Sequence, residues 1–284
     1  MSIPAATPVA DPPVYGSYAP RAGSGLEEEL QRLDDQAGLT AAAELAAMLD
    51  QGLRPTGTIL DLGCGSGAFA RRLRAALPQA VIVGADVDEE LVARLAPPVR
   101  LVTPEGEGIV PGEADDVVVR FVAQHLPPEH RARLWATAMR ALVPGGRVHV
   151  VDVDDADAGA VRPTLPGLRE VYAKIAAAQA ARGGDRRVIA AVPAELRAAG
   201  FEAIRTSVRD VTTRERPIED FRVHLGPQRH LALLRDGTLS PHDFALLSHA
   251  WDVVRRSAGA TVCLRSHLVH ARKPCPPLTL EETS

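Results

Sequence analysis

The chain has 284 residues, of which 46% are hydrophobic and 24% are charged, so it can bury one large core or one core with a modest subdomain. Its net charge of −4 provides no basic excess for binding a phosphate backbone, and nucleic acid is therefore not an expected partner. The three cysteines, Cys64, Cys263 and Cys275, show neither metal-ligand spacing nor an even disulfide framework, so we expect no metal site, no disulfide and a reducing compartment.

The first 24 residues are rich in Pro, Ala, Gly and Ser, which predicts a flexible tail over 1–24. They lack the charged and apolar regions of a secretory signal, and no stretch of the sequence is apolar for the length that a membrane-spanning helix needs. We therefore expect a soluble cytoplasmic protein with no membrane partner.

Helical periodicity begins at Leu26 and predicts an N-terminal helical lid over 25–54. We expect two helices in this segment, with a break near Gly38 and Thr40, because the Thr40 hydroxyl could cap the second helix. Gly52 and Pro55 end the periodic stretch.

Short apolar strands alternate with helices over 55–155. The expected strands are TILDLG, AVIVGADV, VRLVTP, ADDVVVRF and RVHVVDVD, and the expected helices are AFARRLRAAL, EELVARLA and EHRARLWATAMRAL. This alternation implies right-handed crossovers and a mostly parallel sheet with helices on both faces. We therefore predict a doubly wound α/β fold.

The regular alternation of short strands and helices ends after residue 155. The region 156–273 is expected to complete the core, with strands in FEAIRTSVRDVTT and ATVCLRSHLVHARK that pair as an antiparallel edge at the C-terminus. Helical insertions over about 162–186 and 216–259 are expected to form a cap, and 274–284 to form a second loose tail.

The stretch ILDLGCGSGAFA joins the first strand to the following helix through a glycine-rich loop. Gly63, Gly65 and Ala68, with Asp86 at the end of the next strand, allow a dinucleotide-binding interpretation, although this signal alone is weak. A Walker loop is excluded because no Gly-Lys-Ser/Thr follows. Asp61, two residues before the first glycine, would repel a pyrophosphate but would attract an ammonium or a sulfonium group.

Four segments in order resemble the motifs of class I S-adenosylmethionine-dependent methyltransferases. DLGCGSG resembles the first motif, GADVDEE the acidic second motif, ADDVVVRFVAQHLPP the fourth-strand motif, and ALVPGGRVHVVDVD the Pro-Gly-Gly turn before the fifth strand. The resemblance covers about residues 56–155 and implies a Rossmann-like core there. Upstream, EELQRLDDQA resembles the helix that closes over the cofactor in bacterial small-molecule methyltransferases, which implies that Gln36 reaches the cofactor.

The resemblance also implies roles for residues around S-adenosylmethionine. It places Gly63 and Gly65 against the methionine part, Asp61 near its amino group, and Asp86 on the ribose with Val87 beside it. Arg120 would contribute mainly through its backbone carbonyl. Relatives commonly carry Gly-Asp-Ala after the third strand, where this chain has VTPEGEG, so Glu105 is the candidate partner of the adenine amino group.

Candidate catalytic residues are His125, Tyr172 and His224, with His230 as a further cap histidine. His125 could act as a base, because an unperturbed imidazole titrates near neutral pH, or it could order its loop by hydrogen bonding. Tyr172, His224 and His230 lie in the expected cap, where each could orient or deprotonate an acceptor or could be a surface residue.

We therefore expect a methyltransferase that transfers a methyl group from S-adenosylmethionine to oxygen, nitrogen or carbon of a small organic acceptor, such as a secondary metabolite, and releases S-adenosylhomocysteine. Two alternatives remain open at this point. One is a protein of the same fold that binds the cofactor for a non-methylating role, as a cyclase or a regulator, and the other is a nicotinamide-dependent oxidoreductase. The oligomeric state is also open, a homodimer included.

Overall fold

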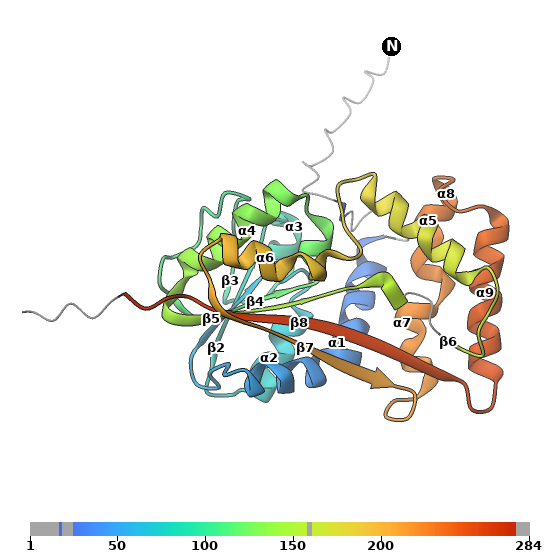
Figure 1. Cartoon of the computed structure of the whole chain (residues 1–284), viewed down its shortest axis with the longest axis horizontal. Coiled ribbons are helices and arrows are strands. Elements are labelled where there is room, and N and C mark those ends of the chain that lie inside the picture. Colours follow the sequence, from blue (N-terminus) through green and yellow to red (C-terminus); the bar gives the residue numbers. More distant parts are fainter. Residues whose placement is uncertain (1–16, 19–24, 158–160, 277–284) are drawn as a thin grey trace, which may run out of the picture.

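In the computed structural model, the described residues are 17–18, 25–157 and 161–276 (Figure 1). Apart from Ser17, Tyr18 and 274–276, the expected tails over 1–24 and 274–284 lie outside them. The strands are β1 (Thr58–Leu62), β2 (Val81–Asp86), β3 (Val99–Leu101), β4 (Ala114–Arg120), β5 (Leu142–Asp152), β6 (Val161–Arg162), β7 (Glu202–Thr212) and β8 (Thr261–Arg272). The α-helices are α1 (Leu26–Asp50), α2 (Ala68–Ala76), α3 (Glu89–Arg94), α4 (Pro128–Ala141), α5 (Leu168–Ala180), α6 (Val192–Ala198), α7 (Arg222–Leu225), α8 (Leu231–Arg235) and α9 (Pro241–Arg256). Short 3-10 turns are η1 (Ala123–His125), η2 (Asp155–Asp157), η3 (Val188–Ala190), η4 (Ile218–Phe221) and η5 (Pro227–His230).

The strands form a single mixed sheet in the order β3-β2-β1-β4-β5-β8-β6, with β7 paired to β8. The pairs from β3 to β5 are all parallel, whereas β8 is antiparallel to β5, β6 and β7. The predicted doubly wound α/β fold with an antiparallel C-terminal strand is therefore confirmed. The two-residue strand β6 was not predicted, because VR alone carries no periodic signal.

Helices cover both faces of the sheet because alternate strand residues point to opposite sides. Ile59 packs in one buried cluster with side chains of α1 and α2, and its neighbour Leu60 packs in another with side chains of α4 and α6. Both side chains are fully buried, and each such burial contributes about 1.5–3 kcal/mol. These two clusters hold the carboxyl ends of the parallel strands at one edge of the sheet.

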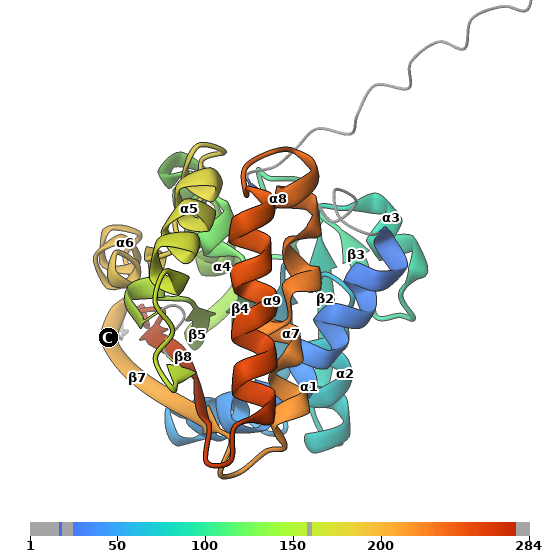
Figure 2. The same ribbon diagram turned by 90° about the vertical axis from the view of Figure 1, so that its right-hand side faces the viewer.

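The cap lies at one end of the molecule, where α5, α7, α8 and α9 gather beyond the carboxyl edge (Figures 1 and 2). Strands β7 and β8 run out from the core to reach it (Figure 1). A third apolar cluster joins Leu168 of α5, Phe221 of η4 and Leu247 of α9 to Val211 and Val262 at the far ends of these strands. The cap is thus built on an extension of the sheet.

Helix α1 is continuous, so the expected break near Gly38 and Thr40 is wrong. Thr40 is fully buried inside the helix, where its hydroxyl donates to the Gln36 carbonyl and accepts from Arg120 Nη2 at 2.8 Å, and the hydroxyl is therefore satisfied without capping. Gly38 gives room to the Arg72 guanidinium, since a Cβ would lie 3.0 Å from its Nη2. Gly38 therefore allows the Arg72 side chain to approach the helix closely, and it does not mark a helix end.

Within the ranges described above, no helix is both long enough and apolar enough to span a membrane.

A buried polar chain crosses the sheet through Asp116, His149, His270 and Ser207. His149 Nε2 lies 3.0 Å from Asp116 Oδ1, the two Nδ1 atoms of His149 and His270 are 2.9 Å apart, and His270 Nε2 lies 3.1 Å from Ser207 Oγ. An ionised Asp116 makes His149 Nε2 a donor, so His149 Nδ1 accepts from His270 Nδ1–H and His270 Nε2 accepts from Ser207. Every ring nitrogen of the two histidines then has a hydrogen-bond partner.

This arrangement predicts a loss of stability in mild acid. Burial, together with the nearby charge of Arg209, lowers the pKa of His270 to about 3. Below about pH 6.5 the unfolded chain therefore binds a proton at this residue that the folded chain does not bind. The free energy of unfolding should fall by up to about 1.4 kcal/mol per pH unit from this group alone. Urea unfolding between pH 8 and pH 5 measures it, and His270→Gln should flatten the slope.

Ser207→Ala is the matched control, because it removes a hydrogen bond to the ring and leaves the titrating group in place. It should keep a slope of the same sign. An unchanged pH dependence in a folded His270→Gln protein would contradict the prediction.

Candidate active site

A cavity of about 2330 Å³ lies between the carboxyl edge of the sheet and the cap. Its wall includes the glycine loop after β1, the ends of β2, β4 and β5, the N-terminal half of α1, and segments of α5, α7 and η5. Pockets for one small ligand are usually about 300–1,000 Å³. The cavity therefore has room for two molecules side by side.

The glycine loop keeps its shape through close contacts and internal hydrogen bonds. Gly63 has φ +82°, and a Cβ there would lie 2.4 Å from Val122 Cγ2, so a larger residue does not fit without movement. The N–H groups of Gly63 and Cys64 donate to the Ala85 carbonyl, and the Gly65 N–H donates to Asp86 Oδ2 at 2.7 Å. These glycines contribute their conformation, because the three N–H groups are already used within the protein.

Asp61 is 1% exposed at the end of β1, and its Oδ2 has no hydrogen-bond partner among the described residues. Burial raises the pKa of this carboxyl to about 7; the Asp86 charge raises it further, while Arg120 acts against the rise. A buried carboxylate with an unused oxygen is costly unless a donor reaches it. The site therefore favours a cationic hydrogen-bond donor at Asp61.

Asp86 ends β2 with both carboxyl oxygens held by backbone donors. Gly65 N–H reaches Oδ2, and Asp88 N–H reaches Oδ1 at 3.0 Å. Burial raises the pKa of Asp86, and these two hydrogen bonds oppose the rise. The carboxyl is thus fixed in orientation while each oxygen keeps a lone pair for a hydroxyl donor. Val87, which follows it, is partly exposed and lines the cavity.

Arg120 at the end of β4 uses its side chain, and not only the backbone carbonyl that the sequence suggests. Its Nε lies 2.6 Å from Glu44 Oε2, and its guanidinium carbon lies 5.0 Å and 4.5 Å from the ring centres of Phe69 and Phe121. Glu44 is fully buried and also accepts from Ser266 Oγ at 2.9 Å. This ion pair ties α1 to β4 and β8 at the cavity wall.

Gln36 and Glu105 differ in their relation to the cavity. Gln36 on α1 is buried, lines the cavity, and accepts a hydrogen bond from Arg32 Nη1 at 3.0 Å. The Glu105 side chain is mostly exposed and lies 3.3 Å from Arg133 Nη1. In this part of the described chain residues 101–104 line the cavity and Glu105 does not, so Glu105 is not placed where the sequence expectation needs it.

His125 lies in η1 under the N-terminal segment. Its Nδ1 is 3.1 Å from Ser17 Oγ, and its ring packs against Tyr18 at a centroid distance of 5.1 Å. Burial, aided by the charges of Arg186 and Arg32, lowers the pKa of His125 to about 3. The ring is therefore neutral at physiological pH and holds residues 17–18 against the cavity, which suits an ordering role better than that of a base.

Tyr172, His224 and His230 come together in the cap wall of the cavity. The rings of Tyr172 and His230 meet edge to face, with centroids 6.2 Å apart. The Nε2 atoms of His224 and His230 are buried without a partner among the described residues, and burial with the nearby Arg229 charge lowers the pKa of both rings. Two neutral imidazoles thus present unused hydrogen-bonding atoms.

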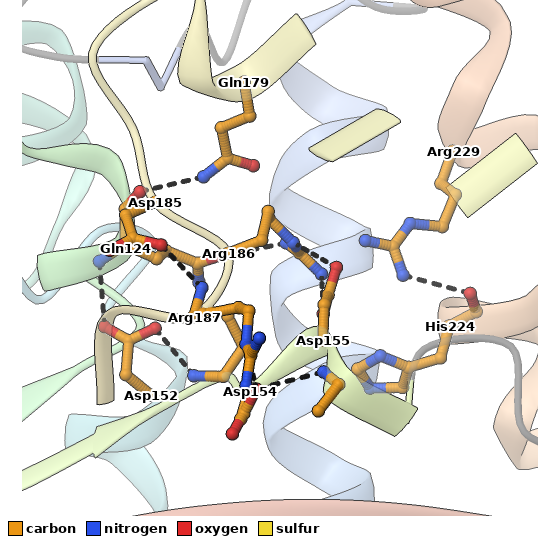
Figure 3. Close-up of polar contacts among 12 residues, drawn as sticks. Gln124, Asp152, Asp154, Asp155, Gln179, Asp185, Arg186, Arg187, His224 and Arg229 are labelled. Carbon is orange, nitrogen blue, oxygen red and sulfur yellow. Dashed lines mark hydrogen bonds and ion pairs between the residues drawn. The ribbon is translucent and has the colours of Figure 1, made fainter. Parts of the chain in front are cut away.

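Sequence reasoning missed a polar network around Arg186 and Gln124, which both line the cavity (Figure 3). Arg186 makes a two-point ion pair with Asp155 at 2.7 and 2.9 Å and donates to Gln124 Oε1 at 2.8 Å. The Gln124 N–H donates to Asp152 Oδ2, and its carbonyl accepts from Gln179 Nε2. Gln124 lies within the VAQHLPP segment, but its partners come from distant segments and carry no local motif.

Arg229 was also missed. It lies in η5, lines the cavity, and donates from Nη1 to the His224 carbonyl at 3.0 Å (Figure 3). Among the described residues, no group of three His, Cys, Asp or Glu side chains is placed to hold a metal ion.

Comparison with known proteins places this geometry in context. Residues 59–146 match the family model described as "Methyltransferase domain". The chain is 30% identical over 119 residues to carboxy-S-adenosyl-L-methionine synthase of Actinobacillus succinogenes, covering 38% of this chain and 48% of that protein. It is 31% identical over 138 residues to trans-aconitate 2-methyltransferase of an Acidovorax species. This match covers 45% of this chain and 50% of that protein. The chain thus spans about half the length of these curated relatives.

Solved structures share the fold. Phosphoethanolamine N-methyltransferase 2 of Haemonchus contortus superposes with a TM-score of 0.50 at 20% identity, covering 81% of this chain and 52% of that one. A SAM-dependent methyltransferase of Thermotoga maritima superposes with a TM-score of 0.51 at 17% identity, covering 87% of this chain and 94% of that one. The match over 59–146 includes the glycine loop, Asp86 and the end of β4, and it stops near the start of β5. Residues 59–146 are therefore similar to a methyltransferase domain, and the chain shares the fold of these solved methyltransferases.

Proposed function

We propose that this protein is a methyltransferase that uses S-adenosylmethionine and acts on a small organic acceptor. One observation carries the proposal. Among the described residues, three buried side-chain polar atoms lack a partner, in Asp61, His224 and His230, and all three residues line the same cavity. Unsatisfied buried polar groups are costly, so their concentration in one cavity points to ligands that complete them.

The residues at the sheet edge fit the cofactor. The unused Asp61 oxygen suits an ammonium group, the oriented Asp86 carboxyl suits ribose hydroxyls, and Gly63 and Gly65 of the loop line the cavity. When bound, this cofactor supplies a methyl group that passes to a lone pair of the acceptor as the carbon–sulfur bond breaks, leaving S-adenosylhomocysteine. In this proposal Gln36, Val87 and Arg120 complete the wall, and Glu105 has no assigned part.

Catalysis by this chain would consist mainly of positioning. Holding two reactants in attack geometry can contribute about 7–11 kcal/mol to lowering a barrier. His224 is neutral at physiological pH, so its unpartnered Nε2 can accept a hydrogen bond from an acceptor O–H or N–H and orient the lone pair. Because its pKa is low, the His224 ring would not keep the proton that the acceptor loses, and this proton would pass to water. Tyr172 would pack beside the acceptor, and His125 would hold the loop.

A non-methylating use of the same cofactor is the second candidate, favoured by the similarity to carboxy-S-adenosyl-L-methionine synthase. The two candidates differ in product, because methyl transfer releases S-adenosylhomocysteine with a methylated acceptor. Mass spectrometry of incubations with candidate acceptors distinguishes them. A role in secondary metabolism remains a prediction from the sequence.

The first prediction here concerns cofactor binding. S-adenosylmethionine should bind in calorimetry and NAD should not, and Asp61→Asn should weaken binding by about tenfold to a hundredfold through loss of a charge-assisted hydrogen bond. Because the pKa of Asp61 is about 7 without ligand, affinity should also fall below pH 7 as the carboxyl is protonated. Asp50→Asn, a change at an exposed aspartate of α1, is the control. Binding of NAD alone would refute the proposal.

A second prediction concerns the ligand-free protein. The folded-state pKa of Asp61 lies above the usual Asp value, so stability from this group is present in acid and is lost as pH rises towards 7. Asp61→Asn should therefore be more stable than the wild type at pH 8 without ligand, by about 1–3 kcal/mol. Urea unfolding at pH 8 and pH 4 measures this. A folded variant of equal or lower stability at pH 8 would contradict it.

A third prediction concerns Gly63. Gly63→Ala should lower both stability and cofactor affinity, because the new Cβ meets Val122 and the backbone has a positive φ. Gly112→Ala shares the positive φ but has nothing within 4 Å of its Cβ, so it isolates the backbone strain. The double variant Gly63→Ala/Val122→Ala should recover part of the loss. Equal effects of Gly63→Ala and Gly112→Ala on thermal unfolding would exclude the clash.

A further inference from the structure

The cap wall carries a cation whose charge is not compensated within the described chain. Arg229 donates to a backbone carbonyl, that of His224, at 3.0 Å, whereas the guanidiniums of Arg32, Arg120 and Arg186, which also line the cavity, have carboxylate partners. Arg186 pairs with Asp155 and Arg32 with Glu29. Figure 3 shows the Arg229 guanidinium turned towards the space that the Arg186–Asp155 pair also faces.

The surroundings of Arg229 disfavour its positive charge. Burial lowers the pKa of Arg229 to about 10, the charges of Arg32 and Arg186 lower it further, and Tyr172 and Asp155 oppose this only in part. A guanidinium has five N–H donors in a planar fork, and the carbonyl of His224 engages only Nη1. The remaining donors and the uncompensated charge are the two properties with which arginine binds a carboxylate.

The neighbouring groups add hydrogen-bonding atoms without adding charge. His224 and His230 are neutral and each has a buried Nε2 without a partner in the described residues. The Arg186–Asp155 pair contributes no net charge and is fixed by Gln124. Among the described guanidiniums whose charges lower the pKa of His224, only that of Arg229 therefore lacks a carboxylate partner. A carboxylate neutralises it, while a phosphate dianion would leave a negative charge near Asp155.

His224 also relates this wall to the cofactor side. The charges of Arg229, Arg32 and Arg120 all lower the pKa of its ring, and these three guanidiniums line the same cavity as the imidazole. Arg120 stands at the end of β4 beside the glycine loop, and Arg229 stands in the cap. An acceptor held at Arg229 would thus pass His224 on the way to the cofactor.

We propose that the acceptor carries a carboxylate, which Arg229 binds through its guanidinium while His224 orients the atom that receives the methyl group. This assignment rests on the proposed function, because it concerns the second ligand of the same cavity. His230 supplies a further hydrogen bond to the bound anion. Arg229 is here a specificity-determining residue, and the wall formed by Arg186, Asp155 and Gln124 keeps the opposite side in place.

The test measures ligand binding with the protein loaded with S-adenosylhomocysteine. The probes are benzoate, hexanoate and trans-aconitate, each paired with its uncharged amide or methyl ester, and inorganic phosphate. Saturation-transfer NMR and calorimetry should show at least one acid binding at least about tenfold more tightly than its uncharged partner, as expected for a charge-assisted hydrogen bond. Arg229→Gln should abolish that preference, and Arg229→Lys should keep part of it.

Arg255→Gln is the matched control, since it removes one positive charge from an exposed position of the cap helix α9. It should leave the preference unchanged. Affinity for S-adenosylhomocysteine should be the same in all variants, which shows that each variant is folded. If Arg229→Gln does not fold, the proposal is tested by Arg229→Lys and by comparing each acid with its uncharged partner on the wild type.

The outcomes separate two failures. No binding of S-adenosylhomocysteine to the wild type would reject the proposed function. Normal binding of S-adenosylhomocysteine without any acid preference, a preference that survives Arg229→Gln, or tighter binding of phosphate than of every acid would reject the carboxylate assignment alone.

Discussion

The buried ion pair between Arg120 and Glu44 is the constraint on which the candidate site depends. It joins the end of β4 to the middle of α1, with Thr40 and Ser266 satisfying further atoms of the two side chains. Breaking such a pair by removing one partner typically costs about 3–5 kcal/mol, because a buried charge is left alone. The pair therefore holds α1 in one position over the sheet, and with it Gln36 and Arg32 at the cavity wall.

The same pair decides the electrostatics of the glycine loop. Arg120 lies near Asp61 and stabilises its charge, but its Nε is 2.6 Å from Glu44 and its Nη2 is bonded to Thr40. The Arg120 charge thus stabilises the Asp61 carboxylate from nearby, but Arg120 forms no direct ion pair with it. A carboxylate kept in this condition is suited to a cationic ligand, whereas a direct Arg120–Asp61 pair would have closed the site to one.

The sequence allowed prediction of what lies along one strand or one loop. Asp61, Gly63 and Asp86 sit at strand ends, so the parallel alternation alone places them at a common edge. The course of the Arg120 side chain, the continuity of α1 through Thr40, and the exposed position of Glu105 beside Arg133 depend on contacts between distant segments. Short-range periodicity carries no record of such contacts, and for that reason Thr40 was interpreted as a cap.

Arg229 and Gln124 were missed for the same reason, since their roles depend on contacts with residues that are distant in the sequence or on the cavity between the cap and the core. The sheet interior provides a contrast to the cavity. Asp116, His149, His270 and Ser207 lie buried across the sheet and satisfy one another, so the fold is able to pair its buried polar groups. Among the described residues, buried side-chain atoms without a partner occur only in Asp61, His224 and His230, and all three line the cavity. Native proteins keep such costly groups mainly where function uses them, which supports the proposals of a cationic ligand group at Asp61 and of a ligand carboxylate at Arg229, beside His224.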